Sequence, residues 1–276
     1  MDKSENKQAS RAWRSIHGLV AQLKQAYEQA QAPIHELKHT RTADPFHILV
    51  ATILSARTQD HTTAAACRRL FPRMETVSAL AAIPIAQLEK LIYPVGFYRT
   101  KARHLKQLPA ALKTLYADVI PQTVEALVKL PGVGRKTANL VVAEAFNKPA
   151  ICVDVHVHRI CNRLGLVETA TPAQTEQALR KRLPLEYWTT FNAYVVSFGQ
   201  TQCRPTHPHC NTCPLADTCP RIGVANYGNR DTLSRTWKRS AFTPPSPASA
   251  QPPIFTEHRT MHQSGDTHNS RHRPSR

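Results

Sequence analysis

The chain has 276 residues, with 36 Lys and Arg against 19 Asp and Glu, and therefore a formal net charge of +17. Such an excess favours a polyanionic partner such as nucleic acid, bound with an affinity that falls as salt rises. No stretch approaches the roughly twenty apolar residues that a membrane-spanning helix needs. Residues 228–276 contribute +5, from eight Lys or Arg and three Asp or Glu, which leaves +12 for residues 1–227. The main part of the chain is itself basic.

Helical spacing prevails after a short leader, Met1–Ser10, which we expect to be flexible. Two apolar stripes have helical period: Trp13, Ile16, Leu19, Val20, Leu23 and Tyr27, then Phe46, Leu49, Val50, Ile53 and Leu54. Prolines or short polar clusters separate the expected helices, near Pro45, Pro72, Pro84, Pro109, Pro121 and Pro172. No convincing alternating strand run occurs. We therefore expect an all-α fold, with about 215 residues available for one large or two modest domains.

A glycine-rich turn, Leu130–Arg135, joins two expected helices at Pro121–Leu130 and Thr137–Phe146. Val124, Leu127 and Val128 would face inward from the first, and Leu140, Val141 and Ala145 from the second. The two glycines of the turn lack a Cβ, so they can adopt positive φ and let a phosphate approach the main chain. Free amides at the start of the second helix would complete an anion site. The hairpin is therefore expected to hold a phosphodiester.

Lys136 stands in the first turn of that second helix, where the positive end of the helix dipole and Arg135 disfavour a charged ammonium. An uncharged amine attacks electrophilic carbon, including the anomeric carbon of a deoxyribose, and forms a Schiff base with the opened sugar. Asp154 would supply the carboxylate for this chemistry. Two plainer interpretations stay open: Lys136 as a solvated cation at a helix start, and Asp154 as an N-cap.

Four of the seven cysteines have the spacing Cys-x6-Cys-x2-Cys-x5-Cys: Cys203, Cys210, Cys213 and Cys219. No apolar signal-peptide stretch opens the chain, so we expect metal ligands rather than disulfides. Structural zinc sites usually have two Cys-x2-Cys knuckles and only one occurs here, while four thiolates also suit an iron–sulfur cluster. From spacing alone, zinc and iron–sulfur are equally supported.

The remaining cysteines, Cys67, Cys152 and Cys161, lack ligand spacing and are expected to be small buried hydrophobes. His207 and His209, between the first two cysteines of the group, are interpreted as loop residues rather than ligands. Residues 228–276 hold six prolines, seven serines and four histidines without apolar periodicity. They cannot bury enough surface to offset the entropy of ordering, so we expect a disordered basic tail that adds non-specific attraction to DNA.

Together, these motifs resemble the endonuclease III family of DNA repair glycosylases, within the helix-hairpin-helix superfamily. Leu130–Asn139 looks like the family's hairpin, Val153–His156 like its aspartate segment, and the cysteine spacing like its [4Fe–4S] loop, in the same order. The resemblance extends from about Trp13 to about Ile222. It implies the helix-hairpin-helix DNA glycosylase fold, with DNA bound between two helical domains. Residues 41–148 would form a six-helix domain with the hairpin, and residues 11–40 with 149–225 the domain that carries the cluster.

The resemblance also implies roles for single residues. Lys136 matches the Schiff-base lysine that attacks C1′ and displaces the damaged base, and Asp154 matches the aspartate that assists it. The four cysteines match the [4Fe–4S] ligands, and the expected DNA contacts of the hairpin are Gly132, Val133, Gly134 and Arg135. Arg57 and Phe97 fall in segments that enter the duplex, where Arg57 would fill the gap left by a flipped base and Phe97 would act as a wedge. Core packing of Phe97 and a phosphate contact by Arg57 are the alternatives.

This chain departs from the family pattern at two places. Arg57 stands where glutamine is common, and its charge would alter the preference for the base on the opposite strand. The segment Arg204–His209 is poorer in fixed cations than the family's basic loop, so phosphate contacts there would be weaker or pH-dependent.

The sequence predicts a bifunctional DNA glycosylase and abasic-site lyase that removes oxidised pyrimidines in base excision repair. It would act inside the cell, as a monomer, on double-stranded DNA with damaged bases or abasic sites. The nearest alternative is a monofunctional mismatch glycosylase of the same superfamily, although those relatives lack a lysine at the hairpin position. A third possibility is a non-enzymatic DNA-binding module whose hairpin and metal loop only clamp the backbone.

Overall fold

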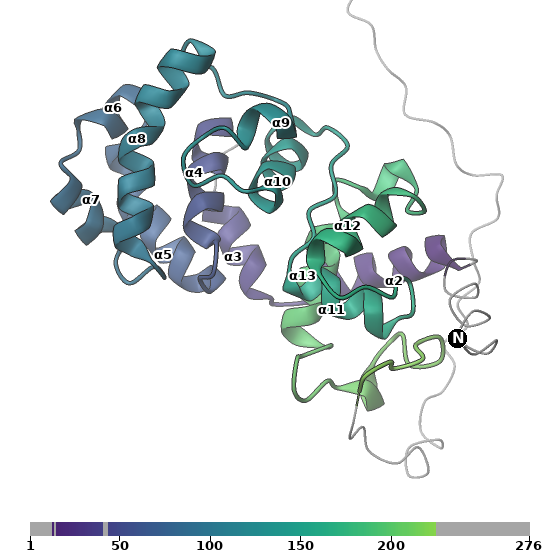
Figure 1. The fold of residues 1–276 in the computed structure, drawn as a ribbon. Helices are drawn as coiled ribbons and strands as arrows, with labels where there is room; N and C mark the ends of the chain where they lie inside the picture. Colours follow the sequence, from purple (N-terminus) through teal and green to yellow (C-terminus); the bar gives the residue numbers. More distant parts are fainter. Residues whose placement is uncertain (1–12, 14, 41–43, 225–276) are drawn as a thin grey trace, which may run out of the picture. The chain divides into compact units, whose positions relative to one another are not determined.

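A computed structural model describes residues 13, 15–40 and 44–224, and every regular element in these ranges is a helix (Figure 1). The all-α expectation is confirmed. The leader Met1–Ser10 and the tail 228–276 lie outside the described residues. In chain order the elements are α2 (Ile16–Gln29), α3 (Pro33–Thr40), α4 (Pro45–Ser55), α5 (Asp60–Leu70), η1 (Phe71–Arg73), α6 (Val77–Ala82), α7 (Ile85–Ile92), α8 (Tyr98–Tyr116), α9 (Val124–Leu127), α10 (Arg135–Phe146), α11 (Val155–Arg163), α12 (Pro172–Arg180), η2 (Leu185–Tyr187), α13 (Phe191–Thr201) and η3 (Cys210–Thr212).

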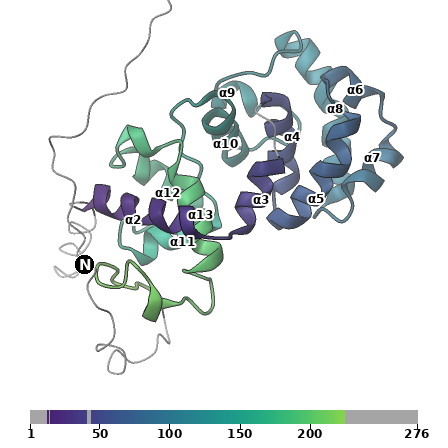
Figure 2. The ribbon, with the colours of Figure 1, turned by 180° about the vertical axis from the view of Figure 1, so that it is seen from behind.

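The helices form two main groups, which both ribbon views show (Figures 1 and 2), and each group encloses a hydrophobic core. The first core takes its buried side chains from helices α4 to α10. The second takes them from α2, α11, α12 and α13. Ala150 belongs to the first core and Ile151 to the second, so the chain passes from one core to the other just before Asp154. The division at residues 41 and 149 expected from the sequence remains a proposal that agrees with these cores.

Local signals in the sequence account for several helix starts. Asp44 caps α4, because its side chain accepts a hydrogen bond from Phe46 N at 3.1 Å, and Pro45 occupies the first turn. Helix α12 begins with a capping box between Thr171 and Gln174. Such caps satisfy amides that have no partner within the helix. Both apolar stripes expected from periodicity are inward-facing, and α4 is buried along almost its whole length.

Three details of the expected helix pattern are wrong. Pro109 does not separate helices but lies inside α8, where a buried stripe continues through it from Leu105 to Leu112. Burial of that stripe outweighs the hydrogen bond that proline cannot donate. The helix expected over Pro121–Leu130 is reduced to α9, which Thr123 caps, and Val128 is 41% exposed rather than inward-facing.

No helix within the described ranges is long and apolar enough to cross a membrane.

Candidate active site

The two glycines of the hairpin between α9 and α10 have different structural roles. Gly132 has φ +76°, and a Cβ there would lie 2.8 Å from His104 Nδ1, so both conformation and space require glycine. Gly134 is the N-cap of α10 with φ −90°, and no atom lies within 4 Å of the position its Cβ would take. The expectation of positive φ is therefore confirmed for Gly132 and wrong for Gly134. The side chain of Val133 is buried, so only its main chain can meet a ligand.

Lys136 and Asp154 share the same neighbours. Lys136 is exposed in the first turn of α10, and Asp154 is half-buried as the N-cap of α11. Burial raises the pKa of the Cys152 thiol to about 12, and the charges of Lys136 and Asp154 act on it in opposite directions. Burial also lowers the pKa of His156. The charge of Asp154 opposes this shift, and the charge of Lys136 adds to it. The fold thus brings the amine and the carboxylate to a common neighbourhood, although eighteen residues separate them in sequence.

One oxygen of Asp154 performs the capping. Oδ1 accepts hydrogen bonds from His156 N and Val157 N, both at 2.9 Å. Oδ2 makes no hydrogen bond with any described residue. The N-cap interpretation is confirmed, and it leaves the second oxygen available to a substrate.

Arg135 is held by a carboxylate that the sequence analysis missed. Its guanidinium donates to both oxygens of Glu176, at 2.8 to 3.1 Å, and the hydrogen bond with Glu176 raises the pKa of Arg135. Glu176 is only 4% exposed and also accepts from Arg180 Nε at 2.9 Å, while Arg180 donates to Asn139 at 3.0 Å. This network fastens α10 to α12. No local signal announces it, because 41 residues separate Glu176 from Arg135.

Arg57 and Phe97 lie next to each other on the surface, at the ends of two separate segments. The guanidinium of Arg57 lies 5.7 Å from the centre of the Phe97 ring. Phe97 is 62% exposed, so the alternative of core packing for this residue is wrong. Both residues have positive φ, 52° for Arg57 and 58° for Phe97. This conformation costs about 1 to 2 kcal/mol for a residue with a Cβ and persists only where surrounding contacts impose it.

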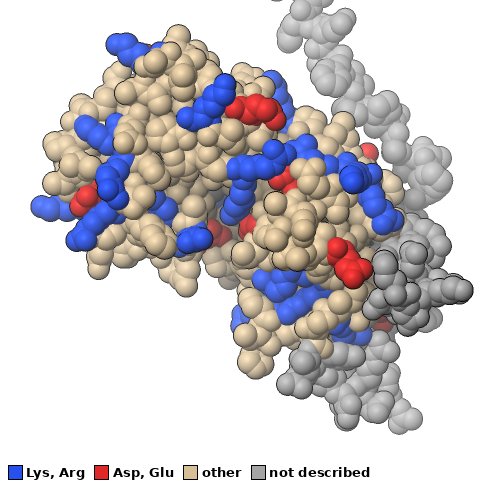
Figure 3. Space-filling view, viewed as in Figure 1, with Lys and Arg blue, Asp and Glu red and all other residues tan. Residues whose placement is uncertain are grey.

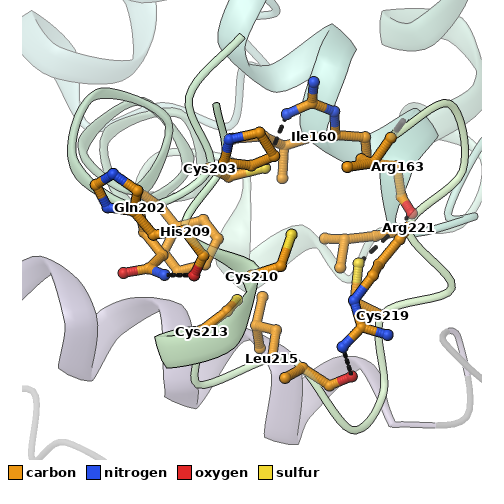
Figure 4. A pocket seen from close by; sticks show the side chains of 15 residues that line it. Ile160, Arg163, Gln202, Cys203, His209, Cys210, Cys213, Leu215, Cys219 and Arg221 are labelled. Atoms are coloured by element: carbon orange, nitrogen blue, oxygen red, sulfur yellow. Dashed lines mark hydrogen bonds between the residues drawn. The ribbon is translucent and has the colours of Figure 1, made fainter. Parts of the chain in front are cut away.

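The four clustered thiols line one hollow beside η3. Figure 4 shows the sulfurs of Cys203, Cys210, Cys213 and Cys219 around a common space. No group of three His, Cys, Asp or Glu side chains in the described ranges is close enough to hold a single metal ion. His209 also lines the hollow, and its backbone N and O are hydrogen-bonded to Gln202. Cys67, Cys152 and Cys161 are buried elsewhere, as expected.

Two arginines of α11 hold the loop that carries the thiols. Arg163 is 9% exposed, and it donates to the carbonyls of Arg204 and Pro205, each at 2.7 Å. Its Nη1 also lies 3.4 Å from Cys203 Sγ. Arg159 donates to Cys203 O at 2.9 Å. Positive charge therefore surrounds the first of the four thiols, which suits an anionic thiolate centre.

One face of the molecule is predominantly basic. Lys and Arg side chains outnumber Asp and Glu on the face seen in Figure 3. Since the charge of residues 1–227 is +12, we expect this part of the protein to attract a polyanion.

An all-helical fold, a hairpin with an open helix start, and a lysine and a carboxylate that act on the same two neighbours are typical of a class of proteins that act on nucleic acid. Residues 50–185 match the model of the HhH-GPD superfamily of base excision DNA repair proteins. Among its relatives, the chain is 44% identical over 196 residues to endonuclease III of Thermotoga maritima, which covers 70% of this chain and 92% of that protein. It is 46% identical over 178 residues to endonuclease III-like protein 1 of Gallus gallus, covering 63% of each. The chain belongs to the endonuclease III family.

Solved structures agree with this assignment. A non-covalent endonuclease III–DNA complex superimposes with a TM-score of 0.68 and 34% identity, over 76% of this chain and 95% of that one. A trapped covalent endonuclease III–DNA intermediate gives the same TM-score and identity, over 76% and 96%. The fold expected from the resemblance is confirmed.

Proposed function

We propose that this protein is a DNA glycosylase and abasic-site lyase for oxidised pyrimidines in duplex DNA, with Lys136 and Asp154 as the catalytic residues. The observation that carries the proposal is that an exposed lysine in the first turn of α10 and a carboxylate whose Oδ2 is outside the cap both act on Cys152 and His156. Its substrate places the protein inside the cell with the DNA, where it acts as a monomer.

The two residues divide the chemistry between a nucleophile and a proton acceptor. Lys136 Nζ bonds to C1′ of the damaged nucleotide as the bond from C1′ to the base breaks. The base leaves with that electron pair and takes a proton from water, and Asp154 Oδ2 accepts a proton from the new ammonium. Asp154 then returns this proton to O4′ as the bond from O4′ to C1′ breaks, which opens the sugar as a protonated imine on Lys136. Loss of a proton from C2′ expels the 3′ phosphate, so the strand breaks on that side without hydrolysis of a phosphodiester.

The hairpin binds the phosphate backbone through its main chain. At position 134, neither φ nor the surrounding protein atoms require a glycine. The open space where a Cβ would lie is therefore suited to a phosphate that approaches the main chain closely. The amides at the start of α10 point at the same ligand. Gly132 and Val133 contribute backbone groups. Arg135 contributes the positive electrostatic potential of its guanidinium, which is already paired with Glu176.

Arg57 and Phe97 enter the duplex where a base leaves the stack. A base must be flipped out for chemistry at its sugar, at a cost of a few kcal/mol in lost stacking. The exposed ring of Phe97 acts as the wedge, and Arg57 beside it fills the gap and hydrogen-bonds the base left behind.

The donor set fits a [4Fe–4S] cluster held by Cys203, Cys210, Cys213 and Cys219. Four sulfurs around a hollow suit a cluster better than one zinc ion, which needs four sulfurs about 2.3 Å from a single point. When bound, the cluster supplies structural order rather than chemistry, by fixing the loop next to the DNA. Visible absorption with about four irons and four sulfides per chain is the expected result, whereas a colourless protein with one zinc would contradict it.

Borohydride trapping on a duplex with one abasic site tests the central proposal. The wild-type protein should form a covalent adduct, and Lys136→Gln should form none while binding the same duplex. Lys129→Gln is the matched control, because Lys129 is an exposed lysine on the other side of the hairpin. Absence of an adduct in the wild-type protein, or an adduct that survives in Lys136→Gln, would overturn the assignment. The first result would favour a monofunctional glycosylase or a DNA-binding module.

A further inference from the structure

The segments that carry Arg57 and Phe97 touch each other backbone to backbone. Gly96 N donates to Thr58 Oγ1 at 3.1 Å. A Cβ at Gly96 would lie only 2.6 Å from Arg57 O, so no other residue fits between the segments without a shift. The two exposed side chains are therefore parts of one contact, although 40 positions separate them in the sequence.

Lys101, in the first turn of α8, fastens this contact from beneath. Its Nζ donates to Leu54 O at 2.7 Å, to Ala56 O at 2.5 Å and to Thr58 Oγ1 at 3.0 Å. Its backbone N donates to Phe97 O at 3.0 Å. An ammonium has three donors, and all three are used on the segment that carries Arg57. One residue thus joins the segment of Arg57 to that of Phe97.

The ammonium of Lys101 is buried without a carboxylate partner. The residue is 6% exposed, no described carboxylate forms an ion pair with it, and burial lowers its pKa to about 8. The carbonyls it meets come from the C-terminal end of α4, where a cation is favoured by the helix dipole. An apolar side chain in this space would leave the carbonyls of Leu54 and Ala56 without this donor, so the position of the segment that carries Arg57 depends on Lys101.

We propose that Lys101 is a positioning residue for base flipping, which holds Arg57 and Phe97 in their strained conformations so that both enter the duplex together. The inference rests on the proposed function. It assigns Lys101 no contact with the substrate. Its effect is confined to substrates whose base must be displaced from a stack, and it leaves the chemistry of Lys136 unchanged.

The test compares two substrates in the full-length protein. One is a duplex with a single oxidised pyrimidine, which requires flipping, and the other is a single-stranded oligonucleotide with an abasic site, which does not. Lys101→Met keeps the length of the side chain and removes the three donors. Excision from the duplex should fall about 10- to 100-fold, as expected when binding groups move by about 1 Å. Borohydride trapping on the single strand should stay within about threefold of wild type, since its chemistry is unaltered.

Lys106→Met is the matched control. Lys106 is on the same helix, and its Nζ also donates to two carbonyls, Ala81 O at 2.5 Å and Ile83 O at 2.8 Å. These carbonyls belong to the end of α6, away from Arg57 and Phe97. For Lys106→Met, the ratio of duplex excision to single-strand trapping should equal that of wild type. The proposal would be overturned if this ratio fell as much in Lys106→Met as in Lys101→Met, or if it did not change in Lys101→Met.

A second variant tests the proposal even if Lys101→Met does not fold. Thr58→Val preserves shape and removes the hydroxyl that links Gly96 N to Lys101 Nζ. Its duplex activity should fall about three- to tenfold relative to its single-strand activity, and an unchanged ratio here also contradicts the proposal. Failure of the proposed function is distinguishable, because the wild-type protein would then form no adduct with either DNA.

Discussion

In the proposed complex with DNA, the hairpin around Gly134 and the paired segments around Arg57 and Phe97 contact the same ligand in opposite ways. The hairpin presents backbone from an unstrained position with open space beside it, at the start of α10. The paired segments present side chains from two residues with positive φ, and the buried Lys101 donates hydrogen bonds to the segment that carries one of them, Arg57. One site is formed by a few consecutive residues, whereas the other depends on parts of the chain about 40 residues apart.

This difference follows from what each site must do. A phosphate is reached from outside the duplex, so amides at a helix start and a missing Cβ are sufficient. A wedge must remain exposed and rigid while it displaces a stacked base, so the rest of the fold must supply the rigidity. The first site should therefore tolerate changes in distant packing, and the second should be sensitive to them.

The largest expected effect is a loss of excision activity in Asp154→Asn, a change that separates the capping role of Asp154 from its catalytic role. Asp154→Asn keeps a side-chain oxygen that can accept from His156 N and Val157 N, and Asn caps helices as well as Asp. Stability to heat should be nearly unchanged, while excision falls about 10²- to 10⁴-fold because the proton acceptor is lost. Asp154→Ala should add an unfolding cost of about 1 kcal/mol. Activity of Asp154→Asn within threefold of wild type would show that the carboxylate only caps.

The two hairpin glycines should respond differently to alanine. Gly132→Ala forces a Cβ into a positive-φ position against His104, so thermal unfolding should show a loss of about 1 to 3 kcal/mol. Gly134→Ala should unfold like wild type, but its affinity for duplex DNA at fixed salt should fall about tenfold, or ~1.4 kcal/mol, because the Cβ meets the phosphate. If Gly134→Ala binds DNA normally, the backbone of this turn does not approach the phosphate.

A smaller effect is expected from the wedge alone. Because Phe97 is 62% exposed, Phe97→Ala should change the free energy of unfolding by less than about 0.5 kcal/mol. Excision of a paired lesion should fall about fivefold, through loss of stacking worth about 1 kcal/mol. Trapping on a single-stranded abasic site provides the reference rate and should not change. A large loss of stability would mean that Phe97 supports the fold instead.

The smallest effect concerns the base on the opposite strand. Arg57 donates hydrogen bonds but accepts none, and across the gap it faces the pairing edge of the opposite base, where guanine offers the two lone pairs of O6 and adenine the single lone pair of N1. Arg57→Gln should reduce the ratio of excision opposite guanine to excision opposite adenine by about threefold. Matched duplexes that differ only in that base give the ratio directly. An unchanged ratio would favour the alternative in which Arg57 contacts a phosphate.

Local patterns were sufficient for much of the molecule. Apolar spacing predicted α2 and α4, and the turn residues predicted the hairpin before α10. The Asp154 cap was one of the interpretations open from the sequence, because a cap depends on residues within three positions of it. The thiols lie within seventeen residues, so their common hollow follows from a short loop. In each case the physical cause acts over a few residues, and the sequence displays it directly.

The sequence by itself determined the helical class, the position of the lysine and the spacing of the thiols. Only the tertiary structure decided that Glu176 holds Arg135, that Lys101 donates to the segment of Arg57, and that Phe97 is exposed beside Arg57 rather than buried. Each of these depends on a contact between parts of the chain about 40 residues apart. Helical period specifies which face of a helix is buried, but it does not specify which distant polar group a buried charge will meet.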